Sequence, residues 1–272
     1  MTLSEPVTHR TVWTHRTPLS RLLLWGFWLL VVALFVYCWN VMTARTMWVF
    51  VQDAPNAAAD LAGRAWPPRW EYMNRLWAPL WDTINIATLG TLLGIVMAVP
   101  LAFLAAANTT PSKLILRPFA LFCIVATRSI NSLIWALLLV SILGPGLLAG
   151  ILAIAFRSVG FIGKLLYEAI EETDEAQIEA ITATGASQAQ ILNYGIVPQV
   201  LPTFYGISVF RWDINIRESA ILGLVGAGGI GAQLQASLNV LAWPQVTLII
   251  LVILATVVVS EWVSARVRHA II

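Results

Sequence analysis

Six long apolar stretches, separated by short polar segments, set the first limit on how this 272-residue chain can fold. Hydrophobic residues make up 59% of the chain and charged residues 11%, whereas a soluble domain is about half apolar and about a quarter charged. Each stretch is long enough to cross a bilayer as a helix, which takes about 20 residues. We therefore predict an all-α, polytopic membrane protein with about six transmembrane helices. The expected spans are approximately 22–41, 79–107, 114–143, 147–166, 200–222 and 246–263.

Residues typical of metal, redox or catalytic chemistry are sparse. Cys38 and Cys123 both lie in apolar runs, and the three histidines stand near the termini without ligand spacing. An intramembrane enzyme is the alternative from another functional class. Asp213 and Glu218 could serve as acid–base groups, but no nucleophile or metal set accompanies them. We expect no metal site, no catalytic residue and no cofactor bound by this chain.

One internal segment, residues 173–202, is polar enough to lie in water between two apolar regions. It reads as two short helices separated by a glycine. Thr173 or Asp174 can cap the first helix and Ser187 the second, and glutamines follow Asp174 and Ser187 at capping-box spacing. Gly185 can end the first helix in a left-handed conformation. The prolines beginning at Pro198 are expected to limit the second helix before the chain re-enters the membrane.

Basic residues predict the orientation. With the N-terminus inside, nine Lys and Arg, Arg157 among them, fall in cytoplasmic segments and four in external loops. Cytoplasmic loops are the more basic ones, so both termini and the polar hairpin are expected in the cytoplasm. The predicted organisation is a cytoplasmic segment 1–20, a first transmembrane helix 21–42, an external loop with an interfacial segment 43–75, and a membrane core 76–270.

Charged and amide side chains interrupt two of the predicted spans. Such residues are costly in a bilayer unless they face a partner or a polar cavity. One interpretation is a pore for an anion, because the arginine fork matches phosphate-like oxygens. The other is an internal ion-pair network, since Asp213 and Arg217 lie one helical turn apart. Both remain open. The candidate pathway residues are Arg128, Ser129, Asn131, Arg211, Asp213, Asn215 and Arg217.

A glycine-rich run follows the fifth span. It lacks the GKS or GKT of a P-loop, so a nucleotide site is poorly supported. Two interpretations remain, and both use the permissive backbone of glycine. The run is either a closely packed re-entrant turn or a flexible external gate whose amides meet the substrate. The residues concerned are Gly223, Gly226, Gly228, Gly229 and Gly231.

Several motifs together resemble one family. They are RSIN at 128–131, LGPG at 143–146, the EA…G…P pattern of the polar hairpin, and RWDINIR at 211–217 leading into VGAGGIG at 225–231. Over roughly residues 75–270 the chain looks like the permease subunit of the phosphonate/phosphite ABC importer family. The hairpin pattern resembles the "EAA" loop of ABC importers in general, whereas the arginine segment joined to the glycine run is more specific.

The resemblance implies a type I importer permease with a MetI-like fold and cytoplasmic coupling helices. Two copies would form the pore in a bacterial inner membrane. Two ATPase subunits, which hold the ATP and Mg²⁺, would dock on the hairpins, and a binding protein would deliver the oxyanion. An importer of the same architecture for methionine or an amino acid is the nearest alternative. The coupling residues implied are Glu179, Ala180, Gly185, Ala186 and Pro198.

Overall fold

The computed structural model describes residues 18–271, and over that range the chain forms helices and turns without a strand. The all-α prediction is therefore confirmed. Most of the expected cytoplasmic segment 1–20 lies outside the described residues. The chain divides into two compact units, one ending at Asp60 and the other running from Leu61.

The first unit contains α1 (Pro18–Arg45) and most of α2 (Trp48–Ala65). The segment Leu19–Arg45 has a mean hydropathy of 2.3, and no part of its most apolar window is buried. A helix this apolar and this long fits the predicted first span. The segment expected as an external loop, 43–75, is largely helical. Helix α2 covers Trp48–Ala65 and continues through Pro55.

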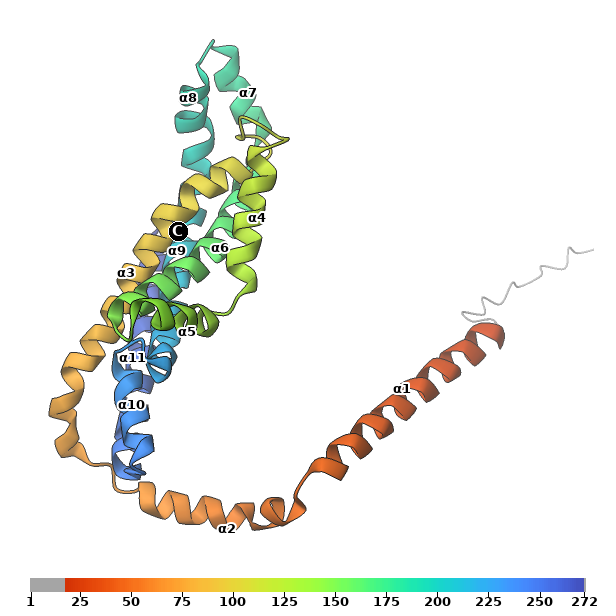
Figure 1. Cartoon of the computed structure of the whole chain (residues 1–272). Helices are drawn as coiled ribbons and strands as arrows, with labels where there is room; N and C mark the ends of the chain where they lie inside the picture. Colours follow the sequence, from red (N-terminus) through yellow and green to blue (C-terminus); the bar gives the residue numbers. More distant parts are fainter. Residues whose placement is uncertain (1–17, 272) are drawn as a thin grey trace, which may run out of the picture. The chain divides into compact units, whose positions relative to one another are not determined.

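Four long helices form the second unit (Figure 1). Small residues allow two of them to approach closely. A β-carbon built on Gly90 would stand 2.7 Å from Cγ2 of Ile154, and one on Gly94 would stand 2.6 Å from Cβ of Ser158. Membrane helices pack through such small residues, since lipid supplies no hydrophobic drive for association. The long helices are α3 (Met73–Ala105), α6 (Leu147–Glu171), α9 (Val197–Leu222) and α11 (Trp243–Ile271).

Two spans are formed by bent pairs of helices, one of which includes α9. Helices α4 (Leu116–Ser129) and α5 (Ser132–Leu143) meet at 91°, and the helical path through α9 meets α10 (Ile230–Asn239) at 41°. Within the described residues, four helices can cross a membrane alone, and six spans result if each bent pair counts as one. This agrees with the predicted number. The sharper break falls where the polar residues interrupt the third apolar stretch.

The glycine run is a tightly packed turn. A β-carbon on Gly223 would lie 2.4 Å from the carbonyl oxygen of Gly228, and one on Gly231 would lie 2.1 Å from that of Ala220. Gly226 has a φ of +91°, and its carbonyl accepts a 3.0 Å bond from the amide of Gly146. These contacts are with backbone atoms that cannot rotate away. They favour the close-packing interpretation over the flexible gate.

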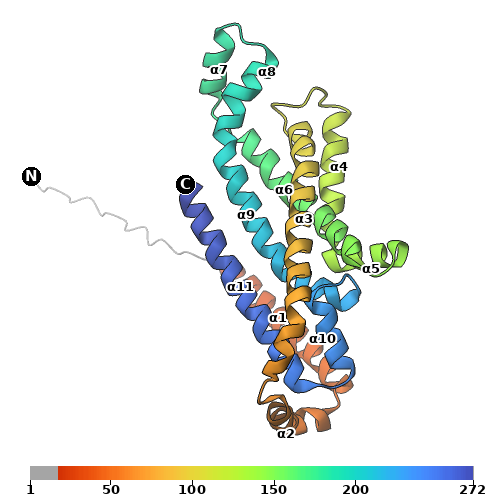
Figure 2. The same ribbon diagram turned by 90° about the vertical axis from the view of Figure 1, so that its left-hand side faces the viewer.

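The polar hairpin protrudes at the end of the bundle opposite α10 in both views (Figures 1 and 2). Its first arm is α7 (Glu175–Ala183), with Asp174 as the N-cap that accepts a 3.0 Å bond from the amide of Ala176. Gly185 has a φ of +80°, as the turn prediction required. The second arm begins with α8 (Gln188–Gln190), where the amide of Ser187 donates to Gln190 at 2.8 Å.

The second arm does not end at the prolines, contrary to our prediction. A π-helical turn, Ile191–Ile196, joins α8 directly to α9, and both Pro198 and Pro202 lie inside the continuous helical path. A proline removes one helical hydrogen bond and crowds the carbonyl four residues earlier. The wider turn just before Pro198, closed by a bond from the amide of Val197 to the carbonyl of Leu192, accommodates that crowding. The hairpin therefore continues into a membrane helix without an interruption.

The close packing of the glycine turn can be tested by a matched pair of substitutions. Gly223→Ala should lower the stability of the protein by about 1–3 kcal/mol, because the added methyl meets fixed backbone. Gly206→Ala, in the middle of α9, meets no atom within 4 Å and should be neutral or slightly stabilising. Thermal denaturation of the purified variants in detergent measures both. Equal melting temperatures would contradict the packing described here.

Candidate functional site

A buried polar cluster ties α9 to α6 and α3. Arg211 is 2% exposed, and its Nε donates to Oγ of Ser158 at 3.0 Å. Asn215, one turn further along α9, donates from Nδ2 to the same Oγ at 2.9 Å and to Oγ1 of Thr91 at 2.7 Å. Three helices thus share one network, inside a bundle where unsatisfied polar groups are expensive.

The charge of Arg211 is only partly balanced within the described residues. Its Nη2 lies 3.4 Å from Oε2 of Glu218, two turns along the same helix. Its guanidinium also stands 5.2 Å from the ring centroid of Phe161, a cation–π contact. The carboxamide oxygen of Asn215 is buried and has no hydrogen-bond partner among the described residues. The cluster therefore holds the three helices together and leaves the Asn215 carboxamide oxygen available as an acceptor.

A second polar set occupies another face of α9. Nη2 of Arg217 donates to Oδ2 of Asp213 at 2.6 Å, and the hydroxyl of Ser260 on α11 donates to Oδ1 of the same carboxylate at 2.8 Å. The Asp213 side chain is 8% exposed and the Arg217 side chain 45% exposed. This geometry matches the ion-pair alternative for these two residues. The exposed part of Arg217 still contributes positive charge to the outer face of α9.

The bend between α4 and α5 carries the remaining candidates. Arg128 and Asn131 are both exposed, and Asn131 is the N-cap of α5, where its side-chain oxygen accepts from the amide of Leu133 at 3.1 Å. Ser129 donates from Oγ to the carbonyl of Val125 at 2.7 Å. The Arg128 guanidinium makes no hydrogen bond or ion pair with the described residues. Arg128 is thus the candidate cation most available to a ligand.

Arg157 lies elsewhere than our charge count assumed. It stands eleven residues into the 25-residue helix α6, and its Nη1 donates to the carbonyls of Arg128 and Ile130, each at 3.0 Å. Without Arg157, eight Lys and Arg remain in the expected cytoplasmic segments, against four in the external loops. Gly160, one turn further along α6, lets the helices meet there, since a β-carbon on it would lie 2.5 Å from the amide nitrogen of Arg128.

The structure groups the candidates into three sets rather than one. Arg211 and Asn215 share a network, Asp213 and Arg217 form a pair, and the residues of the α4–α5 bend stand apart, with no hydrogen bond or ion pair to either set among residues 18–271. Our sequence reading missed the hydroxyl partners. A serine or threonine in an apolar helix gives little signal, because most of these hydroxyls bond to their own helix. The missed partners are Thr91, Ser158 and Ser260.

The predicted coupling residues lie at the tip and base of the hairpin. Glu179, Ala180 and Gly185 are exposed on the first arm and its turn, Ala186 is half-buried, and Pro198 is exposed where α9 begins. A hollow of about 390 Å³ opens beside the turn. Its lining residues are Ile181, Thr184, Gly185, Ala186, Gln190 and Tyr194.

The hairpin is bonded firmly to the bundle. The amide of Asp174 donates to Oε1 of Gln199 at 2.9 Å, and Nε2 of Gln199 donates to the carbonyl of Gly195 at 2.7 Å. On the neighbouring turn, Glu171 accepts from the amide of Ala107 at 2.7 Å and from Nη2 of Arg117 at 3.1 Å. The first pair of bonds joins the start of the first arm to α9, and the second joins the end of α6 to the α3–α4 turn, so a movement of the hairpin is transmitted to the start of α9.

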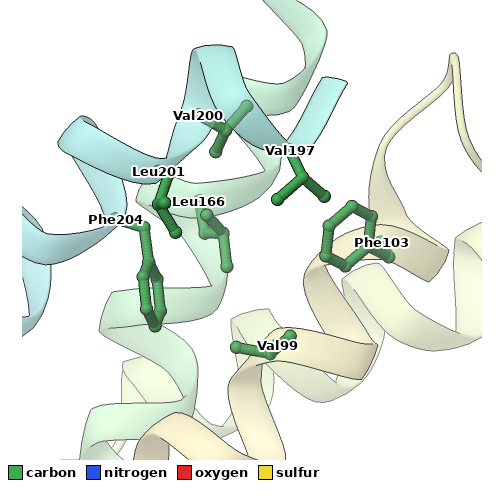
Figure 3. A pocket seen from close by; sticks show the side chains of 7 residues that line it. All are labelled: Val99, Phe103, Leu166, Val197, Val200, Leu201 and Phe204. Atoms are coloured by element: carbon green, nitrogen blue, oxygen red, sulfur yellow. The ribbon is translucent and has the colours of Figure 1, made fainter. Parts of the chain in front are cut away.

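An apolar cavity lies between α3, α6 and the start of α9 (Figure 3). It has a volume of about 240 Å³. Every side chain that lines it is aliphatic or a phenylalanine, so it offers no donor to an anion. We therefore exclude it from the candidate pathway. Its lining residues are Val99, Phe103, Leu166, Val197, Val200, Leu201 and Phe204.

Sequence comparison identifies relatives over most of the chain. It is 39% identical over 233 residues to the phosphite transport system permease protein PtxC of Stutzerimonas stutzeri, which covers 85% of this chain and 83% of that protein. It is also 39% identical over 223 residues to the phosphate-import permease protein PhnE of Mycolicibacterium smegmatis, covering 81% of this chain but only 41% of that protein.

Comparison of folds also identifies a structure of an ABC transporter. The inward-facing structure of the MetNI methionine ABC transporter aligns with a TM-score of 0.65 at 21% identity, over 75% of this chain and 99% of that chain. At that identity the likeness concerns the fold alone, and it agrees with the MetI-like arrangement expected from the motifs. The model of the family "binding-protein-dependent transport system inner membrane component" matches residues 90–271. The chain belongs to this family of inner-membrane transport components.

Proposed function

We propose that the chain is the permease subunit of an ATP-driven importer and that its cargo is a phosphorus oxyanion such as phosphite, a phosphonate or phosphate. The observation that carries the proposal is the 39% identity to a phosphite permease, taken together with an exposed Arg128 at the bend of a membrane span that forms no ion pair with the part of the chain that the structure describes. The chain is a multi-pass membrane component and not an enzyme. A separate ATPase would supply the hydrolysis.

The chemistry of the candidate pathway suits an anion better than a zwitterionic amino acid. An amino acid needs an acidic partner for its ammonium group, whereas the two acids nearest the pathway are engaged, Asp213 by Arg217 and Glu218 by Arg211. Arg128 and the exposed part of Arg217 remain as donors. Relatives named as methionine permeases align with only 32% and 38% of this chain, so a methionine cargo has weaker support.

A complete importer would combine this chain with other subunits. Two copies would enclose the pathway, and a binding protein would deliver the oxyanion at one end. An ATPase would dock on each hairpin, in contact with the hollow around Gly185. Closure of the ATPases would move the hairpins and, through Gln199, the start of α9.

We assign the hairpin end of the bundle to the cytoplasm. The α3–α4 turn, with Lys113 and Arg117, lies at this end, and α11 runs toward it with Arg266 and Arg268 near its C-terminus (Figure 2). Cytoplasmic segments are the more basic ones. Trp66, Trp70, Trp77 and Trp81 are exposed in or near the first turns of α3, at the opposite end of the bundle (Figure 2), as expected at a membrane–water interface. On this assignment residues 1–20 are cytoplasmic, 43–75 are external, and 76–270 form the permease core.

Arg128→Ala should reduce oxyanion uptake by about tenfold or more, because the variant loses a charge-assisted contact to the ligand. The complex should assemble normally, since the Arg128 side chain makes no hydrogen bond or ion pair within residues 18–271. Uptake of phosphite into proteoliposomes containing the permease, its ATPase and its binding protein measures the effect. Arg75→Ala, which removes an equally exposed arginine from α3, is the matched control. Unchanged uptake in Arg128→Ala would refute the anion pathway.

Arg217→Gln should act mainly on stability, by about 1–3 kcal/mol, because it leaves the buried carboxylate of Asp213 without its cation. The double variant Asp213→Asn/Arg217→Gln removes both charges and should recover much of the lost yield. The amount of assembled complex after size-exclusion chromatography distinguishes the two. If the double variant assembles well but transports poorly, Arg217 also serves the cargo. A fully stable single variant would contradict the ion-pair interpretation.

Gly185→Val should uncouple the permease from its ATPase, since a β-branched residue at a φ of +80° is strained and distorts the hairpin turn. Gly185→Asn is the control, because asparagine tolerates a left-handed conformation. Co-purification of the ATPase with each variant is the measurement. We expect strong loss with valine and little with asparagine. Normal ATPase binding by the valine variant would count against a docking role for the hairpin.

A further inference from the structure

The bend between α4 and α5 exposes a problem that every broken membrane helix must solve. The carbonyls at the end of α4 have no helical partner, and lipid offers no donor to replace one. At this bend the chain turns through 91° within the residues between Ser129 and Ser132. Donors from side chains must therefore satisfy the freed carbonyls and hold the turn in shape.

The donor that reaches the freed carbonyls comes from another helix, because the local hydroxyls bond further back in α4. The hydroxyls of Thr127 and Ser129 bond to carbonyls of their own helix, at Cys123 and Val125. The carbonyls of Arg128 and Ile130 lie beyond their reach, and both are bound by Nη1 of Arg157 on α6, at 3.0 Å each. One guanidinium nitrogen therefore ties together the two sides of the break.

The Arg157 guanidinium can donate further hydrogen bonds after making these two. A guanidinium carries N–H groups on all three nitrogens, and Nε and Nη2 of Arg157 have no hydrogen-bond partner among the described residues. Its charge is not neutralised by an acid in that range either. Arg157 therefore places an unneutralised positive charge beside the bend.

We propose that Arg157 is a positioning residue for the oxyanion pathway: it clamps the backbone of the α4–α5 bend and so fixes where the guanidinium of Arg128 meets the cargo. This inference rests on the proposed function. The clamp holds the carbonyl of Arg128 itself and that of Ile130, two residues further on, so the side chain of Arg128 begins from a fixed backbone rather than from a flexible hinge. The charge of Arg157 adds to the field that attracts the anion.

Kinetics of the reconstituted importer test the positioning role. Arg157→Met removes both the clamp and the charge but preserves much of the apolar length, and we expect KM for phosphite to rise about tenfold or more with a smaller change in the maximal rate. Arg157→Lys keeps the charge and one bonding nitrogen and should recover part of the affinity. Arg117→Met is the matched control, because Arg117 also caps a carbonyl, that of Ala105 at 3.1 Å, but at the α3–α4 turn.

A second readout follows the local field directly. The sequence contains only two cysteines, so Cys38→Ser and Cys123→Ser give a cysteine-free background in which Ser129→Cys is a single reporter at the bend. The reporter should react faster with an anionic methanethiosulfonate than with a cationic one. Adding Arg157→Met should reduce that preference several-fold, whereas adding Arg117→Met should leave it unchanged.

The outcomes separate this inference from the proposed function. If wild-type protein transports phosphite and Arg157→Met leaves both KM and the reagent preference unchanged, the positioning role is refuted while the function stands. If wild-type protein transports no phosphorus oxyanion, the proposed function fails, and this use of Arg157 fails with it. A loss of maximal rate alone, equal in Arg157→Met and Arg117→Met, would reduce Arg157 to a structural cap and overturn the inference.

Discussion

The rule that no polar group may remain unsatisfied in hydrocarbon governs this structure. Arg157 binds the carbonyls released at the α4–α5 bend, Ser158 accepts from both Arg211 and Asn215, and Asp213 is held from two helices. These bonds engage buried charged side chains of α9, hydroxyls of neighbouring helices and carbonyls at the bend. Among residues 18–271 the Arg128 guanidinium makes no such bond, so its charge is a part of the chemistry that the fold itself does not use.

Hydrophobic runs predicted the architecture well because a bilayer imposes one length on every spanning helix. The number of spans and the glycine turn of the hairpin followed from local signals. Polar residues at 128–131 mark an interruption of the third apolar stretch, but the 91° bend there was not predicted. The second arm of the hairpin did not. Prolines usually end helices in water, but a π-helical turn before Pro198 absorbs the crowding, and nothing in a single sequence predicts that adjustment.

The candidate residues were found more easily than their partners. A charge in an apolar run is conspicuous, so Arg128, Arg211 and Arg217 could be named from the sequence. For Arg211 and Arg217, the bonding partners depend on how α9 is rotated relative to the helices that pack against it. Residues only two positions apart, Arg211 and Asp213, face different helices. Arg157 was assigned to a cytoplasmic segment because it lies near the end of the predicted apolar span. Helix α6 continues to Glu171, so Arg157 lies near the middle of that helix.

The unbroken passage from hairpin to α9 has a mechanical consequence. Helix α9 is 26 residues long, which corresponds to about 39 Å at 1.5 Å per residue. It is pinned near its middle, where Arg211 and Asn215 bond to Ser158. A rod held at its midpoint behaves as a lever with a fulcrum. A tilt of α9 about this point would move its hairpin end and its Gly223 end in opposite directions, so the closely packed glycine turn joined to Gly223 would have to shift with it.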